Sequence, residues 1–190
     1  MAVASFMLPL GTPMPEFALP DTVSGRLVSS AELAGKPSVV LFICNHCPYV
    51  KHLREGLAGF GRDYRERGIG LVAISANDSV AYPDDAPDAM AREARAAGYS
   101  FPYLFDESQA IARAFRAACT PDLYVFDATG RLAYRGQFDD SRPKNDLPVT
   151  GKDTRAAVDA LLTGKAPAAL QKPSIGCSIK WKPGNDPNDA

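Results

Sequence analysis

The pattern of apolar and polar residues in the first third of the chain predicts a buried strand followed by an amphipathic helix. Residues 39–43 form a continuous apolar run rich in β-branched side chains, and a Gly-Lys-Pro break precedes them. Such a run is typical of a strand that is buried on both faces. Apolar residues then recur at spacings of three and four, which predicts a helix with one buried face. The residues of this face are Val50, Leu53, Leu57, Phe60 and Tyr64.

The following hundred residues continue the alternation of strands and helices. Asp88 and Asp106 are placed as N-caps, because a carboxylate accepts hydrogen bonds from the free N–H groups of a first helical turn. The predicted elements are strands at 69–75 and 101–105, helices at 89–97 and after Asp106 (burying Ile111, Phe115 and Ala118), a hairpin of strands at 123–126 and 132–134, and a last helix at 152–162. This order predicts an α/β fold with a mixed central sheet and helices on both faces.

Two segments flank this alternating core. Residues 12–37 are interpreted as an N-terminal arm that contains a short hairpin. Residues 165–190 hold four prolines and are interpreted as an extended C-terminal tail, distinct from a domain at 1–164. Within the tail, Ile175, Cys177, Ile179 and Trp181 alternate with small or polar residues, which predicts an extended segment with one apolar edge. We expect this edge to dock on the same domain or on a second subunit, as in a homodimer.

Composition and charge narrow the classes of function. The chain has 190 residues, 46% of them hydrophobic, and a net charge of −1. This charge argues against a nucleic-acid or anionic-membrane partner, which requires a basic patch. No apolar run approaches the roughly 18 residues of a membrane span. The first eleven residues contain no Lys or Arg, so we expect no signal peptide, a cytoplasmic location and therefore no pair of structural disulfides.

The candidate chemistry is concentrated between positions 44 and 52. Two of the four cysteines, Cys44 and Cys47, and both histidines, His46 and His52, fall within these nine residues. A C-x-x-C pair that follows a buried strand and opens a helix can close a small disulfide ring. We expect the free N–H groups of the helix to face Cys44 and favour its thiolate, and protonated His46 to add positive charge. No cofactor is required, because electrons pass between thiols.

Other interpretations of these residues stay open at this point. Cys44 and Cys47 can be ordinary buried thiols. A zinc site usually needs a second C-x-x-C or a matched pair of histidines, and neither is present, so no metal is expected. A set made of Cys44, Cys47, His52 and Cys119 would form only if the tertiary fold brought these residues together. His52 by itself is best interpreted as part of a solvated helix face.

The sequence resembles the thioredoxin-fold redoxin proteins, the group shared by TlpA-like thiol–disulfide oxidoreductases and the alkyl hydroperoxide reductase/thiol-specific antioxidant family. The resemblance covers roughly residues 11–163. The motifs that carry it are Gly11–Phe17, the strand at 39–43 with its C-x-x-C, Val72–Ser75, Phe101–Asp106 and Thr120–Asp127. The Gly-Cys-Ser-Ile-Lys-Trp stretch that ends at Trp181 resembles the tail of one poorly characterised redoxin subfamily.

This resemblance implies a function and a distribution of roles. Cys44 would be the nucleophile, Cys47 would resolve the mixed disulfide, and a cis Thr120–Pro121 bond would present backbone to an extended substrate. Cys119 would then lie on the active-site side. The substrates would be protein or small-molecule thiols and disulfides, with a thiol as electron donor.

The sequence also departs from two patterns of the family. The peroxiredoxin motif P-x-x-x-T-x-x-C has Cys44 in its Thr position and Val40 in its Pro position, and no Arg occurs from Ala117 to Gly130. No acidic residue lies in the strand at 39–43, where many thioredoxins bury one. We therefore predict a thiol–disulfide oxidoreductase. The alternatives are a peroxiredoxin-like antioxidant peroxidase and a non-enzymatic metal-binding or interaction module.

The two remaining cysteines each have two interpretations. Cys119 is either a third redox thiol or a small core residue. Cys177 lies about fifteen residues beyond the last predicted helix, a length of chain that can span up to roughly 50 Å and so reach the C-x-x-C pair. It is either a resolving or regulatory thiol or one more apolar side chain of the tail.

Overall fold

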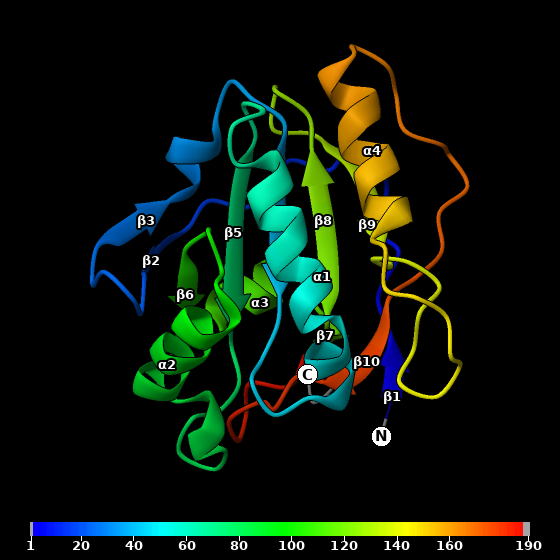
Figure 1. Cartoon of the computed structure of the whole chain (residues 1–190). Helices are drawn as coiled ribbons and strands as arrows, with labels where there is room; N and C mark the ends of the chain where they lie inside the picture. The colour runs from blue at the N-terminus through cyan, green and yellow to red at the C-terminus, as the bar shows by residue number, and fades with distance from the viewer. Residues whose placement is uncertain (1, 188–190) are drawn as a thin grey trace.

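The computed structural model describes residues 2–187 and contains a central five-stranded mixed sheet (Figure 1). Its strand order is β6-β5-β4-β8-β9, with β4 parallel to β5, β5 parallel to β6, and β8 antiparallel to both β4 and β9. The strands are β4 (Ser38–Phe42), β5 (Gly70–Ser75), β6 (Tyr103–Phe105), β8 (Asp122–Phe126) and β9 (Leu132–Gly136). The predicted mixed sheet, the buried central strand and the hairpin are therefore confirmed.

Helices cover both faces of this sheet, as predicted. They are α1 (Pro48–Tyr64), α2 (Pro87–Ala97), α3 (Ala110–Ala114) and α4 (Lys152–Leu162), with 3-10 turns η1 (Ser30–Leu33) and η2 (Pro83–Asp85). Side chains alternate along β4, so Val39 and Leu41 pack with residues of α1, α2 and α4, whereas Val40 and Phe42 pack with α3 and the N-terminal arm. Figure 1 shows α1 and α2 in front of the sheet and α3 behind it. None of the described helices has the length and hydropathy that crossing a membrane requires.

Two predicted helix starts need correction. Helix α2 begins at Pro87 with Ala86 as N-cap, so Asp88 lies in its first turn; proline is well suited to the first helical position. Helix α3 has five residues and its N-cap is Gln109, although the carboxylate of Asp106 still accepts the N–H groups of Ile111 and Ala112 at 2.9 Å each. Ala118 lies beyond α3, because the chain leaves the helix at Phe115.

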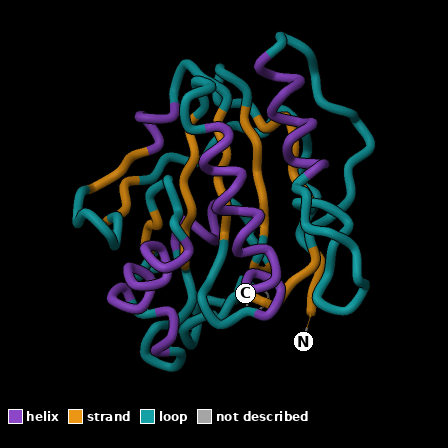
Figure 2. Tube along the Cα trace, in the orientation of Figure 1, coloured by secondary structure: helices purple, strands orange, loops and turns teal. Residues whose placement is uncertain are grey.

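Both flanking segments pack on the central fold. The arm forms the expected hairpin of β2 (Ala18–Pro20) and β3 (Leu27–Ser29). The tail leaves α4 as a long loop, which Figure 2 shows, and returns as β10 (Ile175–Ser178). There it joins a second sheet in the order β1-β10-β7, with β1 (Ala2–Ala4) and β7 (Cys119–Thr120) on its two sides.

The tail therefore docks on its own domain through backbone pairing rather than through the predicted apolar edge alone. Ile179 is buried, but Ile175 is exposed and Gly176 is buried instead. Gly176 is buried because it packs directly against the Thr120 backbone. A homodimer stays a prediction.

Candidate active site

Both cysteines of the C-x-x-C pair converge on Thr120. They lie in the loop from β4 to α1 and are almost fully buried, at 1% exposure for Cys44 and 0% for Cys47. The Cys44 sulfur lies 3.2 Å from the Thr120 hydroxyl, and the Cys47 thiol donates to the Thr120 carbonyl oxygen at 3.1 Å. The Thr120–Pro121 peptide bond is cis, as the resemblance implied. Residues more than 70 positions apart thus meet at one point of the fold.

The N-terminus of α1 lies at Cys47, which corrects the expectation that Cys44 faces it. Pro48 is the first helical residue and Cys47 is the N-cap. The pKa of Cys47 is lowered, first because the Cys44 thiol donates to its sulfur, and further by the Cys177 thiol and the N–H groups of Val50 and Cys177. Burial opposes this shift. When Cys47 ionises, its thiol can no longer donate to the Thr120 carbonyl oxygen. The groups that donate to the Cys47 sulfur outnumber this one acceptor, so the pKa of Cys47 is still lowered.

The contact between the two sulfurs, which lowers the pKa of Cys47, raises the pKa of Cys44. Its thiol proton is held by the Cys47 sulfur, burial disfavours its charged form, and the carboxylate of Asp85 repels a second negative charge. The thiolate of the pair is therefore expected on Cys47, with Cys44 as its hydrogen-bond donor.

Asp85 is a site residue that the sequence reasoning missed. It ends η2 and is fully buried, and its two carboxylate oxygens accept three hydrogen bonds. The donors are the backbone N–H of Asn45 at 2.7 Å, the side-chain amide of Asn77 at 2.8 Å, and the ring of His46 through Nδ1 at 2.5 Å. Asp85 thereby holds the loop between the two cysteines, and nothing in the sequence distinguished it from the other acidic residues of its loop.

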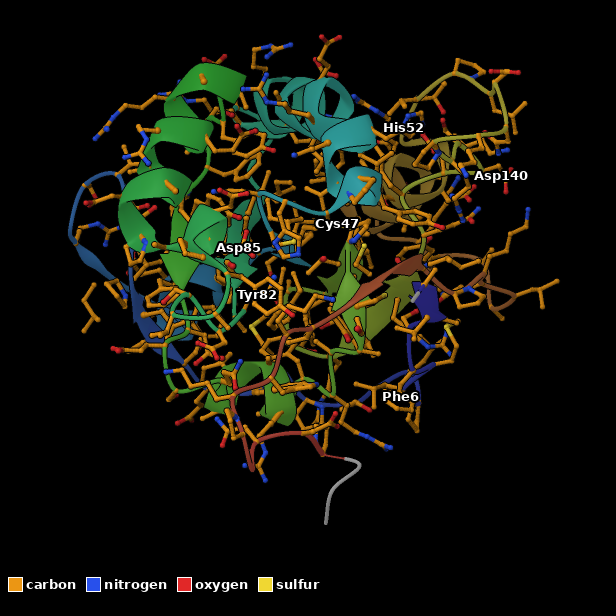
Figure 3. The ribbon with its side chains drawn as sticks, turned by 90° about the horizontal axis from the view of Figure 1, so that it is seen from below. Phe6, Cys47, His52, Tyr82, Asp85 and Asp140 are labelled. Carbon is orange, nitrogen blue, oxygen red and sulfur yellow. The ribbon has the colours of Figure 1, made fainter. Side chains whose placement is uncertain are left out.

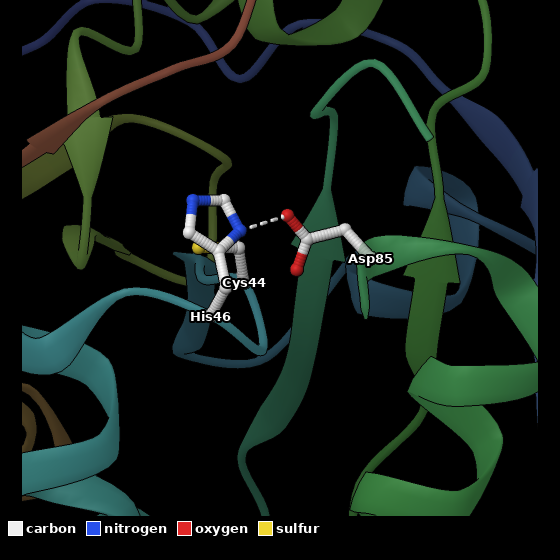
Figure 4. Close-up of side chains that lie close together, drawn as sticks. All are labelled: Cys44, His46 and Asp85. Carbon is white, nitrogen blue, oxygen red and sulfur yellow. Dashed lines mark hydrogen bonds and ion pairs between the residues drawn. The ribbon is translucent and has the colours of Figure 1, made fainter. Parts of the chain in front are cut away.

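The His46 ring contacts Asp85 through Nδ1, and a ring nitrogen also lies within 4.8 Å of the Cys44 sulfur, so its expected role as a charge beside Cys44 stays a prediction. Figure 4 shows the pair with the Cys44 sulfur behind the ring. The ring also stacks on Tyr82, with centroids 5.3 Å apart, and Figure 3 shows Tyr82 and Asp85 on the same side of Cys47. The Asp85 carboxylate and the Tyr82 ring therefore fix the orientation of the His46 ring.

One group among the described residues has the composition of a metal site. Ligand atoms of Cys44, His46 and Asp85 all lie within 4.8 Å of one another. Sulfur, nitrogen and oxygen donors of this kind suit zinc, with a fourth position left open. This set differs from the one considered in the sequence, since His52 bonds to Ser141 at 2.6 Å instead. The Asp85 oxygens are already occupied by hydrogen bonds, which a metal would have to displace.

Cys119 and Cys177 have different surroundings. Cys119 is fully buried, its thiol donates to the Pro121 carbonyl, and burial raises its pKa, all of which favour the interpretation as a core residue. Cys177 is half-buried and stands opposite Thr120 in the β10–β7 pairing. Burial and its contact with Cys47 raise its pKa to about 11.

Asp122 is a second buried acid that the sequence reasoning missed. It lies on β8, the strand next to β4, opposite Phe42 and directly after Pro121. One oxygen accepts the Ala118 N–H and the Tyr124 hydroxyl, and the other has no partner within the described part of the chain. Burial raises its pKa to about 7, against the partial effect of these hydrogen bonds.

The raised pKa of Asp122 predicts that stability falls as pH rises from about 4 to about 7. In this window folded Asp122 keeps its proton, whereas the unfolded residue loses it, so each step upward favours unfolding. Asp122→Asn removes this contribution, which we expect to be at least about 1 kcal/mol across the window. Urea unfolding of both proteins from pH 4.5 to 8 measures it. Equal pH dependence in the two proteins would contradict the assignment.

Comparisons with known proteins give one family and a set of similar structures. The sequence profile of the AhpC/TSA family matches residues 10–135. An uncharacterized conserved protein from Geobacillus kaustophilus is 51% identical, with a TM-score of 0.95 and coverage of 97% of this chain and 98% of that one. A hypothetical protein from Sinorhizobium meliloti is 48% identical, with a TM-score of 0.93 and coverage of 95% and 99%.

A more distant structure agrees on the fold. A thiol:disulfide interchange protein of the thioredoxin family from Chlorobium tepidum shares 21% identity and a TM-score of 0.61, over 82% of this chain and 99% of that one. At this identity the likeness shows the thioredoxin-like fold alone. Comparison with curated proteins found no match.

Proposed function

The chain belongs to the AhpC/TSA family, and from this premise we propose that it is a thiol–disulfide oxidoreductase that works through Cys44 and Cys47. The observation that carries the proposal is the convergence of both sulfurs on Thr120, at the N-terminus of α1. The substrates are thiols and disulfides of proteins or small molecules, and a thiol donor returns the pair to its reduced state.

The electrostatics of the pair favour Cys47 as the attacking thiolate, the reverse of the order that the resemblance implied. The Cys47 thiolate attacks one sulfur of a substrate disulfide, forms a mixed disulfide and releases the other sulfur as a thiolate. Cys44 then attacks the Cys47 sulfur, and the second substrate sulfur leaves. The Cys44 proton passes to the leaving thiolate. The substrate disulfide is thus reduced by two electrons and the Cys44–Cys47 disulfide is formed.

The surrounding residues position this pair. The Thr120 hydroxyl lies 3.2 Å from the Cys44 sulfur and can donate to it as negative charge develops there. Asp85 fixes the Asn45–His46 turn between the two cysteines through the Asn45 N–H and the His46 ring. These contacts keep both sulfurs close to Thr120, the Cys44 sulfur at its hydroxyl and the Cys47 sulfur at its carbonyl oxygen.

A titration of the protein in glutathione buffers of increasing oxidised fraction tests the proposal, with mass-spectrometric mapping of all four thiols. We expect Cys47 to lose alkylation in a two-electron disulfide couple whose first partner is Cys44, while buried Cys119 stays reduced. The proposal fails if Cys44 and Cys47 remain reduced throughout. Rapid consumption of peroxide with sulfenic acid on Cys47 would support the peroxidase alternative instead.

A further inference from the structure

The C-terminal strand β10 reaches the active site because it pairs with Thr120. Strand β10 runs antiparallel to β7, with Cys177 opposite Thr120 and Ser178 opposite Cys119. Thr120 is the residue that both active-site sulfurs contact. The pairing therefore places Cys177 beside the redox pair, although about 130 residues of chain separate them.

The approach of β10 to Thr120 is unusually close because of Gly176. A Cβ atom added to Gly176 would lie 2.0 Å from the Thr120 carbonyl oxygen, which is the oxygen that accepts the Cys47 thiol. With no side chain there, Cys177 stands opposite Thr120, packs against the same apolar cluster as Cys47 and contributes to lowering the Cys47 pKa. The sulfurs of Cys44 and Cys177 thus share one neighbour.

Buried polar side chains hold the tail in this position. The carbonyl oxygen of the Asn77 side chain accepts the Lys180 N–H at 2.8 Å, while its amide donates to Asp85. Fully buried Gln109 donates to the Lys180 carbonyl at 2.9 Å and accepts the Lys182 N–H at 2.8 Å. On the outer side, β1 pairs with β10. The arrangement is built into the fold from several elements, and the same Asn77 links the tail to the loop of the two cysteines.

We propose that Cys177 is a third redox-active thiol, which exchanges with the Cys44–Cys47 disulfide to form a Cys47–Cys177 disulfide. This inference rests on the proposed function, which supplies the first disulfide. The Cys177 sulfur attacks the Cys47 sulfur, the Cys47–Cys177 bond forms and the Cys44–Cys47 bond breaks. Cys44 leaves as a thiolate and takes up the proton lost by Cys177, so no net oxidation occurs. The disulfide within the C-x-x-C loop is thereby replaced by one that joins Cys47 to the tail.

The test uses oxidised glutathione on Cys44→Ser, with and without Cys177→Ser, followed by peptide mapping. In Cys44→Ser, glutathione first adds to Cys47, and Cys177 then displaces it. We expect the Cys47–Cys177 crosslink to exceed glutathionylated Cys47 on the order of tenfold, because the reaction is intramolecular. The double variant should keep glutathione on Cys47. Cys119→Ala in the Cys44→Ser background is the matched control and should leave the crosslink unchanged.

The same experiment separates failure of this inference from failure of the proposed function. Cys44→Ser that keeps glutathione on Cys47 beside a free Cys177 overturns the inference. Wild-type protein mapped in parallel reports the Cys44–Cys47 disulfide, whose absence counts against the proposed function only. If Cys44→Ser fails to fold, wild-type protein decides the inference: a Cys47–Cys177 crosslink that grows as the Cys44–Cys47 crosslink declines supports it, and its absence overturns it.

Discussion

Cys47→Ser will abolish the first step of disulfide exchange, whereas Cys44→Ser will retain it. The reason is that the pKa of Cys47, the N-cap of α1, is lowered by the Cys44 thiol first, then by the Cys177 thiol and the N–H groups of Val50 and Cys177. The pKa of Cys44 is instead raised, first by its contact with the Cys47 sulfur, then by burial and by the Asp85 carboxylate. Because the thiolate is the nucleophile, we expect Cys47→Ser to lower the rate of the first exchange at least about 100-fold.

Release of a coloured thiol from an aromatic disulfide measures this first exchange directly. Cys44→Ser should show a rapid release of one equivalent of thiol, with the other half of the reagent trapped on Cys47 once Cys177 is also replaced by serine. In the wild-type protein, which keeps the Cys44 and Cys177 thiols, the rate of the first release should level off well below pH 9, since these contacts lower the pKa of Cys47. Cys119→Ala is the control for loss of an unrelated thiol. Rapid release from Cys47→Ser and none from Cys44→Ser would restore the roles implied by the resemblance.

The position of the helix start decides these roles, and its signal was present in the sequence. Proline is favoured at the first helical residue, so Pro48 marks Cys47 as the N-cap. The C-x-x-C spacing alone places both cysteines near the helix but does not say which of them caps it. The continuous apolar run predicted β4, and the apolar periodicity predicted α1, for a similar reason. Both patterns depend on local burial, which the chain encodes over a few residues.

Asp85 and β10 could not be predicted in the same way, because their partners are distant in the chain. The Asn45 N–H that Asp85 accepts lies 40 positions away, and the Thr120 that Cys177 faces lies 57 positions away. The alternation from Ile175 to Trp181 predicted an extended segment. It could not predict the register, which depends on how closely two backbones approach each other at Gly176.

Gly176→Ala will release the C-terminal strand from the active site. The new methyl group would lie 2.0 Å from the Thr120 carbonyl oxygen and 2.6 Å from its carbon, and both are backbone atoms that no rotamer change can move. Because φ at Gly176 lies outside the left-handed region, the loss of stability comes only from the overlap of the new methyl group with the Thr120 backbone. We expect a loss of about 3 kcal/mol from the overlap. This corresponds to a fall of roughly 6–12 °C in Tm for a chain of this size.

Gly59→Ala is the matched control, because it makes the same substitution in a different environment. A Cβ at Gly59 of α1 has one neighbour, the Arg62 guanidinium at 3.7 Å, so Gly59→Ala should leave Tm unchanged or raise it.

Release of β10 should also uncover Cys47, so its alkylation rate should rise about tenfold in Gly176→Ala. Limited proteolysis should cut the tail of this variant first. An unchanged Tm together with unchanged Cys47 alkylation would mean that β10 does not hold Thr120 and Cys47 in the buried arrangement. A lowered Tm with faster alkylation would show that Gly176 is what lets the tail reach the redox pair.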